Sequence, residues 1–205
     1  MRKVSVSVVK SIIVWSGLVL MGASGMSERM HEQVSEGMRS DHTVGQQRAY
    51  FAAGCFWGVE AIFSEVDGVV ETAVGYMNGD TDDPTYEEVC YKNTGHAEAV
   101  EVIYEPSTIS YEELCQLFWR LHDPTTLNRQ GPDVGSQYRS GIFYQSEEER
   151  AIALAVKQQA QVHWNQPIVT EILSAAPFYK AEDYHQDYLS RRGISHTGCH
   201  FLREW

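Results

Sequence analysis

The sequence predicts an α+β fold with two helices packed on a sheet that is mainly antiparallel. First, strand-like and helix-like patterns follow one another in the order β-α-β-β-α-β-α-β, which contains the split βαβ pattern. Second, residues 97–104 alternate between two faces, as the side chains of a strand do. Third, capping-box patterns that begin at Ser110 and Ser146 mark the starts of two amphipathic helices.

The remaining elements follow from periodicity and from turn residues. Strands are expected at 48–53, 69–76, 97–104, 139–144 and 168–173, and helices at 56–65, 110–122, 146–163 and 182–192. Residues 125–138, rich in Gly, Asn, Asp and Gln, predict a long functional loop. Residues 78–84 hold three aspartates, but Pro84 stands where a calcium loop needs a ligand, so we expect a plain loop.

The composition indicates one globular domain with an acidic surface. The chain has 205 residues, of which 43% are hydrophobic, enough to bury a core. The formal net charge of -12 argues against nucleic acid and anionic membranes as partners. The cysteines are Cys55, Cys90, Cys115 and Cys199, and none has the C-x-x-C spacing of a zinc ribbon or a thioredoxin-like motif. We expect a monomer.

The N-terminal region has the pattern of a signal peptide. Residues 1–25 combine a basic start, an apolar run at 12–21 that is short for a membrane span, and small residues at 23–25. Residues 26–47 are polar and predict a linker, so the folded domain would span 48–205. The expected location is periplasmic or extracellular after cleavage; the alternative is an uncleaved membrane anchor.

The stretch Gly54-Cys55-Phe56-Trp57-Gly58 lies between an apolar strand and a helix-like pattern. Cys55 is therefore expected at a helix N-terminus, where unpaired amide N–H groups and the helix dipole favour an anion. The pKa of its thiol should fall below the free value of roughly 8.5, which would make it reactive beside two exposed aromatic rings. A buried, inert cysteine in a strand-to-helix turn fits this stretch equally well.

The alternating strand places a glutamate among apolar side chains whichever face is buried. Glu98 shares a face with three apolar residues, and Glu101 lies on the opposite face. A carboxyl group on an apolar sheet face is desolvated, which raises its pKa and can keep it protonated near neutral pH. The residues by themselves favour the alternative, an edge strand whose glutamate reaches solvent.

Six stretches within residues 48–189 carry a resemblance to one family. They are Gly54-Cys55-Phe56-Trp57-Gly58, Gly75-Tyr76-Met77-Asn78-Gly79, Pro84-Thr85-Tyr86, Gly95-His96-Ala97-Glu98-Ala99, His122-Asp123-Pro124-Thr125 and Gly135-Ser136-Gln137-Tyr138-Arg139-Ser140. Together and in this order they resemble the A-type methionine sulfoxide reductases, which are peptide-methionine (S)-S-oxide reductases. The resemblance implies a ferredoxin-like βαββαβ core with an additional helix, an additional strand and a long C-terminal tail.

The resemblance, which selects Glu98, also assigns roles to the site residues. Reducing a sulfoxide needs a nucleophile on sulfur and a proton for the departing oxygen, and Cys55 and Glu98 are expected to supply them. Phe56 and Trp57 would form an aromatic wall for the substrate's methyl group. The other implied substrate-binding residues are Tyr86 and Tyr138, which match tyrosines that hydrogen-bond the oxygen, and Asp133, which matches an acidic pocket residue.

Cys199 is the expected resolving cysteine, since it lies in a tail with glycine and serine that can swing towards Cys55. Attack on a sulfoxide leaves a sulfenic acid, which a second thiol converts to a disulfide. The resemblance supports this role because His185-Gln186-Asp187-Tyr188-Leu189 precedes the resolving cysteine in relatives, although the usual Asn-Pro is missing here and the tail is longer. It also implies an external thiol reductant, a thioredoxin-like protein or dithiothreitol, with oxidised proteins or free methionine sulfoxide as substrates and no bound cofactor.

Other functions stay open at this point. Cys55 could serve a peroxidase or an acyl-transfer hydrolase, although no Cys-His-Asn arrangement is recognisable. A non-catalytic module could instead hold oxidised methionine in a pocket formed by Phe56 and Trp57. A metal site is not expected, because the tail residues His185, His196, Cys199 and His200 fit no standard zinc spacing.

Overall fold

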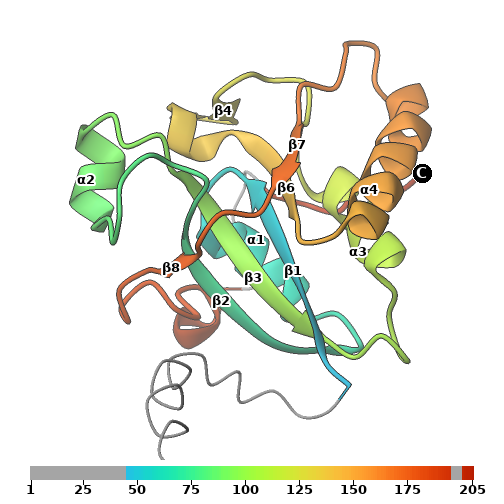
Figure 1. Cartoon of the computed structure of the whole chain (residues 1–205), viewed down its shortest axis with the longest axis horizontal. Coiled ribbons are helices and arrows are strands. Elements are labelled where there is room, and N and C mark those ends of the chain that lie inside the picture. Colours follow the sequence, from blue (N-terminus) through green and yellow to red (C-terminus); the bar gives the residue numbers. More distant parts are fainter. Residues whose placement is uncertain (1–44, 195–199) are drawn as a thin grey trace, which may run out of the picture. The chain divides into compact units, whose positions relative to one another are not determined.

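A six-stranded sheet forms the centre of the computed structural model, which describes residues 45–194 and 200–205 (Figure 1). The predicted signal peptide, most of the predicted linker and Cys199 lie outside the described residues. The strands are β1 (Gln47–Ala53), β2 (Val69–Met77), β3 (Ala97–Tyr104), β6 (Ser140–Tyr144), β7 (Glu171–Ser174) and β8 (Tyr179–Lys180), with a separate small sheet of β4 (Arg129–Gln130) and β5 (Asp133–Val134). The α-helices are α1 (Phe56–Phe63), α2 (Tyr86–Tyr91), α3 (Tyr111–Leu121) and α4 (Glu147–Ala160), and 3-10 turns occur at Ser136–Tyr138, Gln161–His163 and Ser190–Arg192.

The strand order is β7-β6-β1-β3-β2-β8. Its four central strands, β6-β1-β3-β2, pair antiparallel, and with the crossover helices α1 and α3 they form the predicted ferredoxin-like βαββαβ core. The predicted additional helix and strand are α4 and β7, and β7 pairs parallel to β6. The predicted fold class is therefore confirmed, with β8 as an edge strand that the sequence did not indicate.

The alternation along β3 separates two apolar layers. Val100, Val102 and Tyr104 belong to the large core between the sheet and helices α1 and α3, and each is fully buried. Ala97 and Ala99 belong to a smaller cluster on the other face. The even-numbered side chains of β3 therefore point to the helices, and Glu98 lies on that face.

Capping residues explain where three of the helices begin. Ser110 and Glu113 form a reciprocal capping box at α3, as predicted. The Ser146 side chain caps α4, but the predicted box is incomplete there, because the Glu149 side chain accepts from Gln145 N instead of Ser146 N. Thr85 and Glu88 form a third capping box, which starts α2. α2 is not among the predicted helices, because six residues are too short to show a helical period.

The predicted helix at residues 182–192 is wrong. The segment from residue 181 to 194, called the 181–194 segment below, consists of turns and the short 3-10 helix Ser190–Arg192. Side chains take the place of helical hydrogen bonds: the Gln186 amide accepts from Val74 N at 2.9 Å and donates to Val74 O at 3.0 Å. Asp187 has a left-handed φ of 51°, which interrupts a right-handed helix.

The two long connections also differ in detail from the prediction. Residues 125–138 are largely irregular, as predicted, but contain β4, β5 and a 3-10 turn. The strand expected at 168–173 begins only at Glu171. Within the part of the chain that the structure describes, no helix is long and apolar enough to cross a membrane.

Candidate active site

Cys55 lies at the N-terminus of α1, in the turn that follows β1, as the sequence predicted. Gly54 makes this turn possible, because its φ is 92° and an added Cβ would lie 2.6 Å from the Gln130 Cβ. Cys55 is half-buried. The strand-to-helix turn thus holds the thiol at the end of β1, beside the face on which Glu98 lies.

Burial dominates the ionisation of Cys55. The pKa of the thiol is raised to about 12, first by burial and second by the negative charge of Glu98. Hydrogen bonds from the backbone N–H groups of Trp57 and Gly58 lower this pKa, as expected of a helix N-terminus, but they do not offset the burial. The predicted low pKa is therefore wrong for this structure, in which Cys55 is a neutral thiol at pH 7.

Glu98 is a buried carboxyl group directly beside the cysteine turn. Glu98 is 2% exposed, and its Oε2 accepts a hydrogen bond from Phe56 N at 3.0 Å. Burial raises the pKa of Glu98 to about 8, so the carboxyl is mainly protonated at pH 7, as predicted. Protonation also removes the Glu98 charge that acts on Cys55, which leaves burial as the chief cause of the high thiol pKa.

Two tyrosines and an aspartate surround the same space. Tyr86 is the first residue of α2, Tyr138 ends a 3-10 turn, and Asp133 lies in β5. The pKa of each tyrosine is raised, chiefly by burial and then by contributions that include the Glu98 charge, and the Asp133 charge acts on Cys55 and Tyr138. The structure therefore brings the predicted oxygen-binding and acidic residues together around Cys55 and Glu98.

The aromatic wall differs from the prediction in one respect. Trp57 is half-buried, but Phe56 is 1% exposed, so of the two rings it is Trp57 that keeps accessible surface for a substrate. The Trp57 Nε1–H donates to His185 Nδ1 at 3.1 Å, and the Tyr188 ring stacks on the indole at a centroid distance of 3.7 Å and an angle of 6°. His185 and Tyr188 belong to the tail motif His185-Gln186-Asp187-Tyr188-Leu189, and the motif alone does not predict that they line the site.

His185 is neutral in this arrangement. It is 1% exposed, and burial lowers the pKa of its ring, with the nearby Glu182 opposing. Because Nδ1 accepts the Trp57 hydrogen bond, the ring proton belongs on Nε2. The nearest carboxylate oxygen to that nitrogen, Glu182 Oε2, is 3.9 Å away. The helix predicted for residues 182–192 implies no contact between His185 and Trp57, so no pattern in the sequence indicates it.

The family model for peptide methionine sulfoxide reductase matches residues 47–203, which include all of these elements. The chain belongs to the peptide methionine sulfoxide reductase family. The family predicted from the six sequence motifs is confirmed, and the protein is an oxidoreductase that reduces methionine sulfoxide.

Individual relatives agree with this membership. A protein of Methanosarcina acetivorans, peptide methionine sulfoxide reductase MsrA, is 57% identical over 152 residues, which are 73% of this chain and 81% of the relative. The reduced form of Mxr1 from Saccharomyces cerevisiae has a TM-score of 0.75 at 39% identity and covers 80% of this reductase and 95% of that chain. Mxr1 in complex with Trx2 has a TM-score of 0.55 at 29% identity, covering 80% and 94%.

The remaining cysteines of the reductase differ in their surroundings. Cys90 is half-buried on α2, one helical turn after Tyr86. Cys115 is fully buried in α3. Cys199 lies outside the described residues, but the next residue, His200, is 1% exposed, and its Nε2 lies 2.7 Å from Ala53 O.

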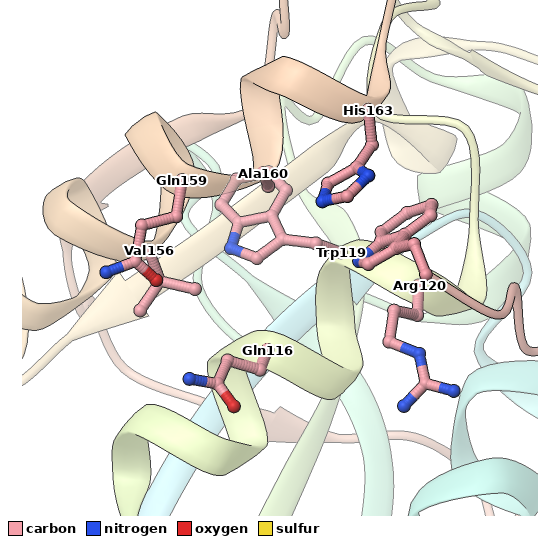
Figure 2. A pocket seen from close by; sticks show the side chains of 8 residues that line it. Gln116, Trp119, Arg120, Val156, Gln159, Ala160 and His163 are labelled. Carbon is pink, nitrogen blue, oxygen red and sulfur yellow. The ribbon is translucent and has the colours of Figure 1, made fainter.

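Outside this site, the residues that the structure describes show no metal centre but do line further cavities. No group of three His, Cys, Asp or Glu side chains within 45–194 and 200–205 is arranged to hold a metal ion. A cavity of about 260 Å³ lies between α3 and α4 (Figure 2). Its lining residues, none of them a predicted site residue, are Gln116, Trp119, Arg120, Val156, Gln159, Ala160, His163 and Trp205.

Proposed function

We propose that this reductase reduces the S-sulfoxide of methionine with Cys55 as the nucleophile and Glu98 as the acid. The observation that carries the proposal is the position of Glu98, a buried carboxyl hydrogen-bonded to the residue next to Cys55. A buried carboxyl with a pKa of about 8 is a proton donor at neutral pH, and its hydrogen bond to Phe56 N holds it beside Cys55. A sulfoxide oxygen is a strong acceptor that such a donor can bind.

The first half-reaction transfers the oxygen from substrate to enzyme. Hydrogen bonds from Glu98 and the tyrosine hydroxyls withdraw electrons from the sulfoxide sulfur, which the Cys55 sulfur attacks. A bond forms between the two sulfurs as the sulfoxide oxygen takes the Glu98 proton. The oxygen then moves to the Cys55 sulfur, the S–O bond to the substrate and the bond between the two sulfurs both break, methionine leaves, and Cys55 becomes a sulfenic acid. One oxygen moves, the substrate gains two electrons, and Cys55 loses two. The neutral Cys55 thiol gives up its proton during this step, and this proton replaces the one that Glu98 gives to the oxygen.

The second half-reaction uses Cys199 and an external dithiol. The Cys199 thiol condenses with the Cys55 sulfenic acid, which forms a disulfide and releases water. Two observations support this role: His200, the neighbour of Cys199, is bonded to Ala53 two residues before Cys55, and the related Mxr1 forms a complex with Trx2. We propose that a thioredoxin-type protein then reduces the disulfide.

A stereochemical assay tests the first half-reaction. Purified enzyme with dithiothreitol should reduce the S-sulfoxide of N-acetyl-methionine and leave the R form unchanged, because a fixed methyl wall and fixed oxygen donors accept one epimer. A binding module would bind the sulfoxide without turnover, and a peroxidase would consume hydroperoxide instead. Equal rates on both epimers would contradict the proposed pocket.

Disulfide mapping tests the second half-reaction. One equivalent of sulfoxide without reductant should oxidise two thiols, and peptide mapping should link Cys55 to Cys199. With thioredoxin as donor, Cys199→Ser should complete one turnover and stall as the sulfenic acid, whereas the control Cys90→Ser should cycle normally. A link between Cys55 and Cys90 would show that the resolving cysteine is misassigned.

The cellular role rests on the N-terminal sequence pattern. We propose that residues 1–25 are removed on export and that the enzyme repairs oxidised proteins in the periplasm or outside the cell. Mass spectrometry of the protein from its source cell should find a mature N-terminus near residue 26. Full-length protein in the membrane fraction would favour a membrane anchor instead.

A further inference from the structure

Glu60 is a buried carboxyl group that the proposed chemistry does not use. It lies on α1 three residues after Trp57, so both side chains are on neighbouring parts of one helix face. The residue is 2% exposed. Its Oε2 accepts a hydrogen bond from Asp187 N at 2.9 Å, and its Oε1 is buried without a hydrogen-bond partner among the described residues.

The backbone that Glu60 holds has a conformation that needs support. Asp187 has a φ of 51°, which non-glycine residues adopt uncommonly. The next residue, Tyr188, places its ring parallel to the Trp57 indole at 3.7 Å. The Arg192 guanidinium lies over the Tyr188 ring, 3.6 Å from the ring centroid. The stack of Trp57, Tyr188 and Arg192 therefore involves the residue directly after Asp187, whose N–H is bonded to Glu60.

Trp57 is also fixed at its nitrogen by the same segment. Its Nε1–H donates to His185 Nδ1, two residues before Asp187. The two residues that orient the indole, His185 and Tyr188, thus lie on either side of the Asp187 N–H, which donates to Glu60. A displacement of the Asp187 backbone would move both contacts together, since they are joined by three peptide bonds.

We infer that Glu60 is a positioning residue that holds the turn at Asp187 and Tyr188 against Trp57 and so fixes the wall for the substrate's methyl group. This inference rests on the proposed role of Trp57 in substrate binding. Glu60 does not touch the reacting atoms, so its loss should weaken binding of the sulfoxide and leave the chemical step nearly unchanged.

The charge of Glu60 gives the inference a distinctive signature. Burial and the charge of Asp187 raise the pKa of Glu60 to about 7, while Arg191 and the N–H groups of Asp187 and Tyr188 lower it. The ionised carboxylate is the stronger acceptor for these N–H groups. The KM of the wild-type enzyme for sulfoxide should therefore fall as pH rises from 6 to 7.5.

The experiment measures KM and kcat for N-acetyl-methionine S-sulfoxide with dithiothreitol in the full enzyme. Glu60→Ala should raise KM about tenfold, because a hydrogen bond to a charged group is lost, with kcat within about threefold of wild type. Glu60→Gln keeps an acceptor oxygen for Asp187 N and should restore KM to within about threefold at pH 7. The KM of this variant should no longer change between pH 6 and 7.5.

A double-mutant cycle tests the route of the effect. If Glu60 acts through Tyr188, Glu60→Ala should add nothing to the KM of Tyr188→Ala. The matched control is Glu65→Ala, which removes a carboxylate from an exposed residue just beyond α1 and should leave KM unchanged. Equal effects of Glu60→Ala with and without Tyr188 would overturn the inference.

The Gln variant decides the matter even where Glu60→Ala fails to fold. A KM of Glu60→Gln that follows pH as the wild type does would also overturn the inference. These outcomes are separate from those that test the proposed function, because a failed nucleophile assignment would appear as residual turnover of Cys55→Ser.

Discussion

The two sides of the site are held by different forces. Cys55 and Glu98 come from the β1–α1 turn and from β3, in which paired strands and a fully buried core fix the backbone. The 181–194 segment, which closes the Trp57 side, is held by side-chain contacts from Glu60, Glu182 and Gln186. The residues of the proposed chemistry therefore lie on regular secondary structure, the β1–α1 turn and β3, called the frame below. The shape of the substrate wall depends instead on the irregular 181–194 segment.

This difference predicts how variants should divide. Substitutions on the frame that touch the reacting atoms should lower kcat, because they remove groups used in the transition state. Substitutions in the 181–194 segment should mainly raise KM, because they loosen the wall against which the substrate binds. A substitution in the 181–194 segment that lowers kcat without raising KM would contradict this division between the two sides of the site.

The largest effect is expected for Cys55→Ser. The hydroxyl keeps the size of the thiol, so the fold should be unchanged, but an alkoxide is inaccessible at neutral pH and turnover should be abolished. The measurement is sulfoxide reduction with dithiothreitol, together with a thermal melt to confirm folding. Substantial activity with any reductant would refute the assignment of the nucleophile.

Glu98→Gln should have the next largest effect. Its amide keeps the shape and the hydrogen bond to Phe56 N but cannot donate an acidic proton, and such groups contribute about 10²–10⁴-fold. We expect kcat to fall by that factor with little change in KM. The control is Glu101→Gln, which changes a carboxylate on the opposite face of β3, bonded to Arg48. Activity of Glu98→Gln within a few-fold of wild type would place the proton donor elsewhere.

The frame was predictable from the sequence, and the segment was not. The bounds of β3 were predicted to the residue because side chains that alternate between two faces are typical of a strand. The start of α3 was predicted from the capping box that begins at Ser110. The pKa of Cys55 was mispredicted because burial depends on distant elements that a local pattern does not contain. Gln186 bonds to a strand 112 residues away, and no periodicity reports such a contact.

A smaller effect is expected from pH. The folded-state pKa of Glu98, about 8, is above the value of a free glutamate, about 4.3, so folding favours the neutral acid. That contribution to stability is fully present below about pH 4 and is lost as pH rises through about 8. The kcat of the wild type should accordingly fall about tenfold per pH unit above 8, measured at saturating S-sulfoxide. A flat profile to pH 10 would contradict the acid role of Glu98.

The smallest effect is expected for Gln186→Ala. The amide bonds to Val74 N and O and to Ala181 O, so truncation leaves polar backbone groups of β2 without these partners. Such losses cost about 1–3 kcal/mol, which should lower the melting temperature by a few degrees. KM should rise a few-fold, since the segment also carries His185, while kcat stays near wild type. The control Gln159→Ala, an exposed residue on α4, should change neither quantity. A tenfold loss of kcat at unchanged KM would show that the segment takes part in the chemistry and that the two sides of the site are not separable.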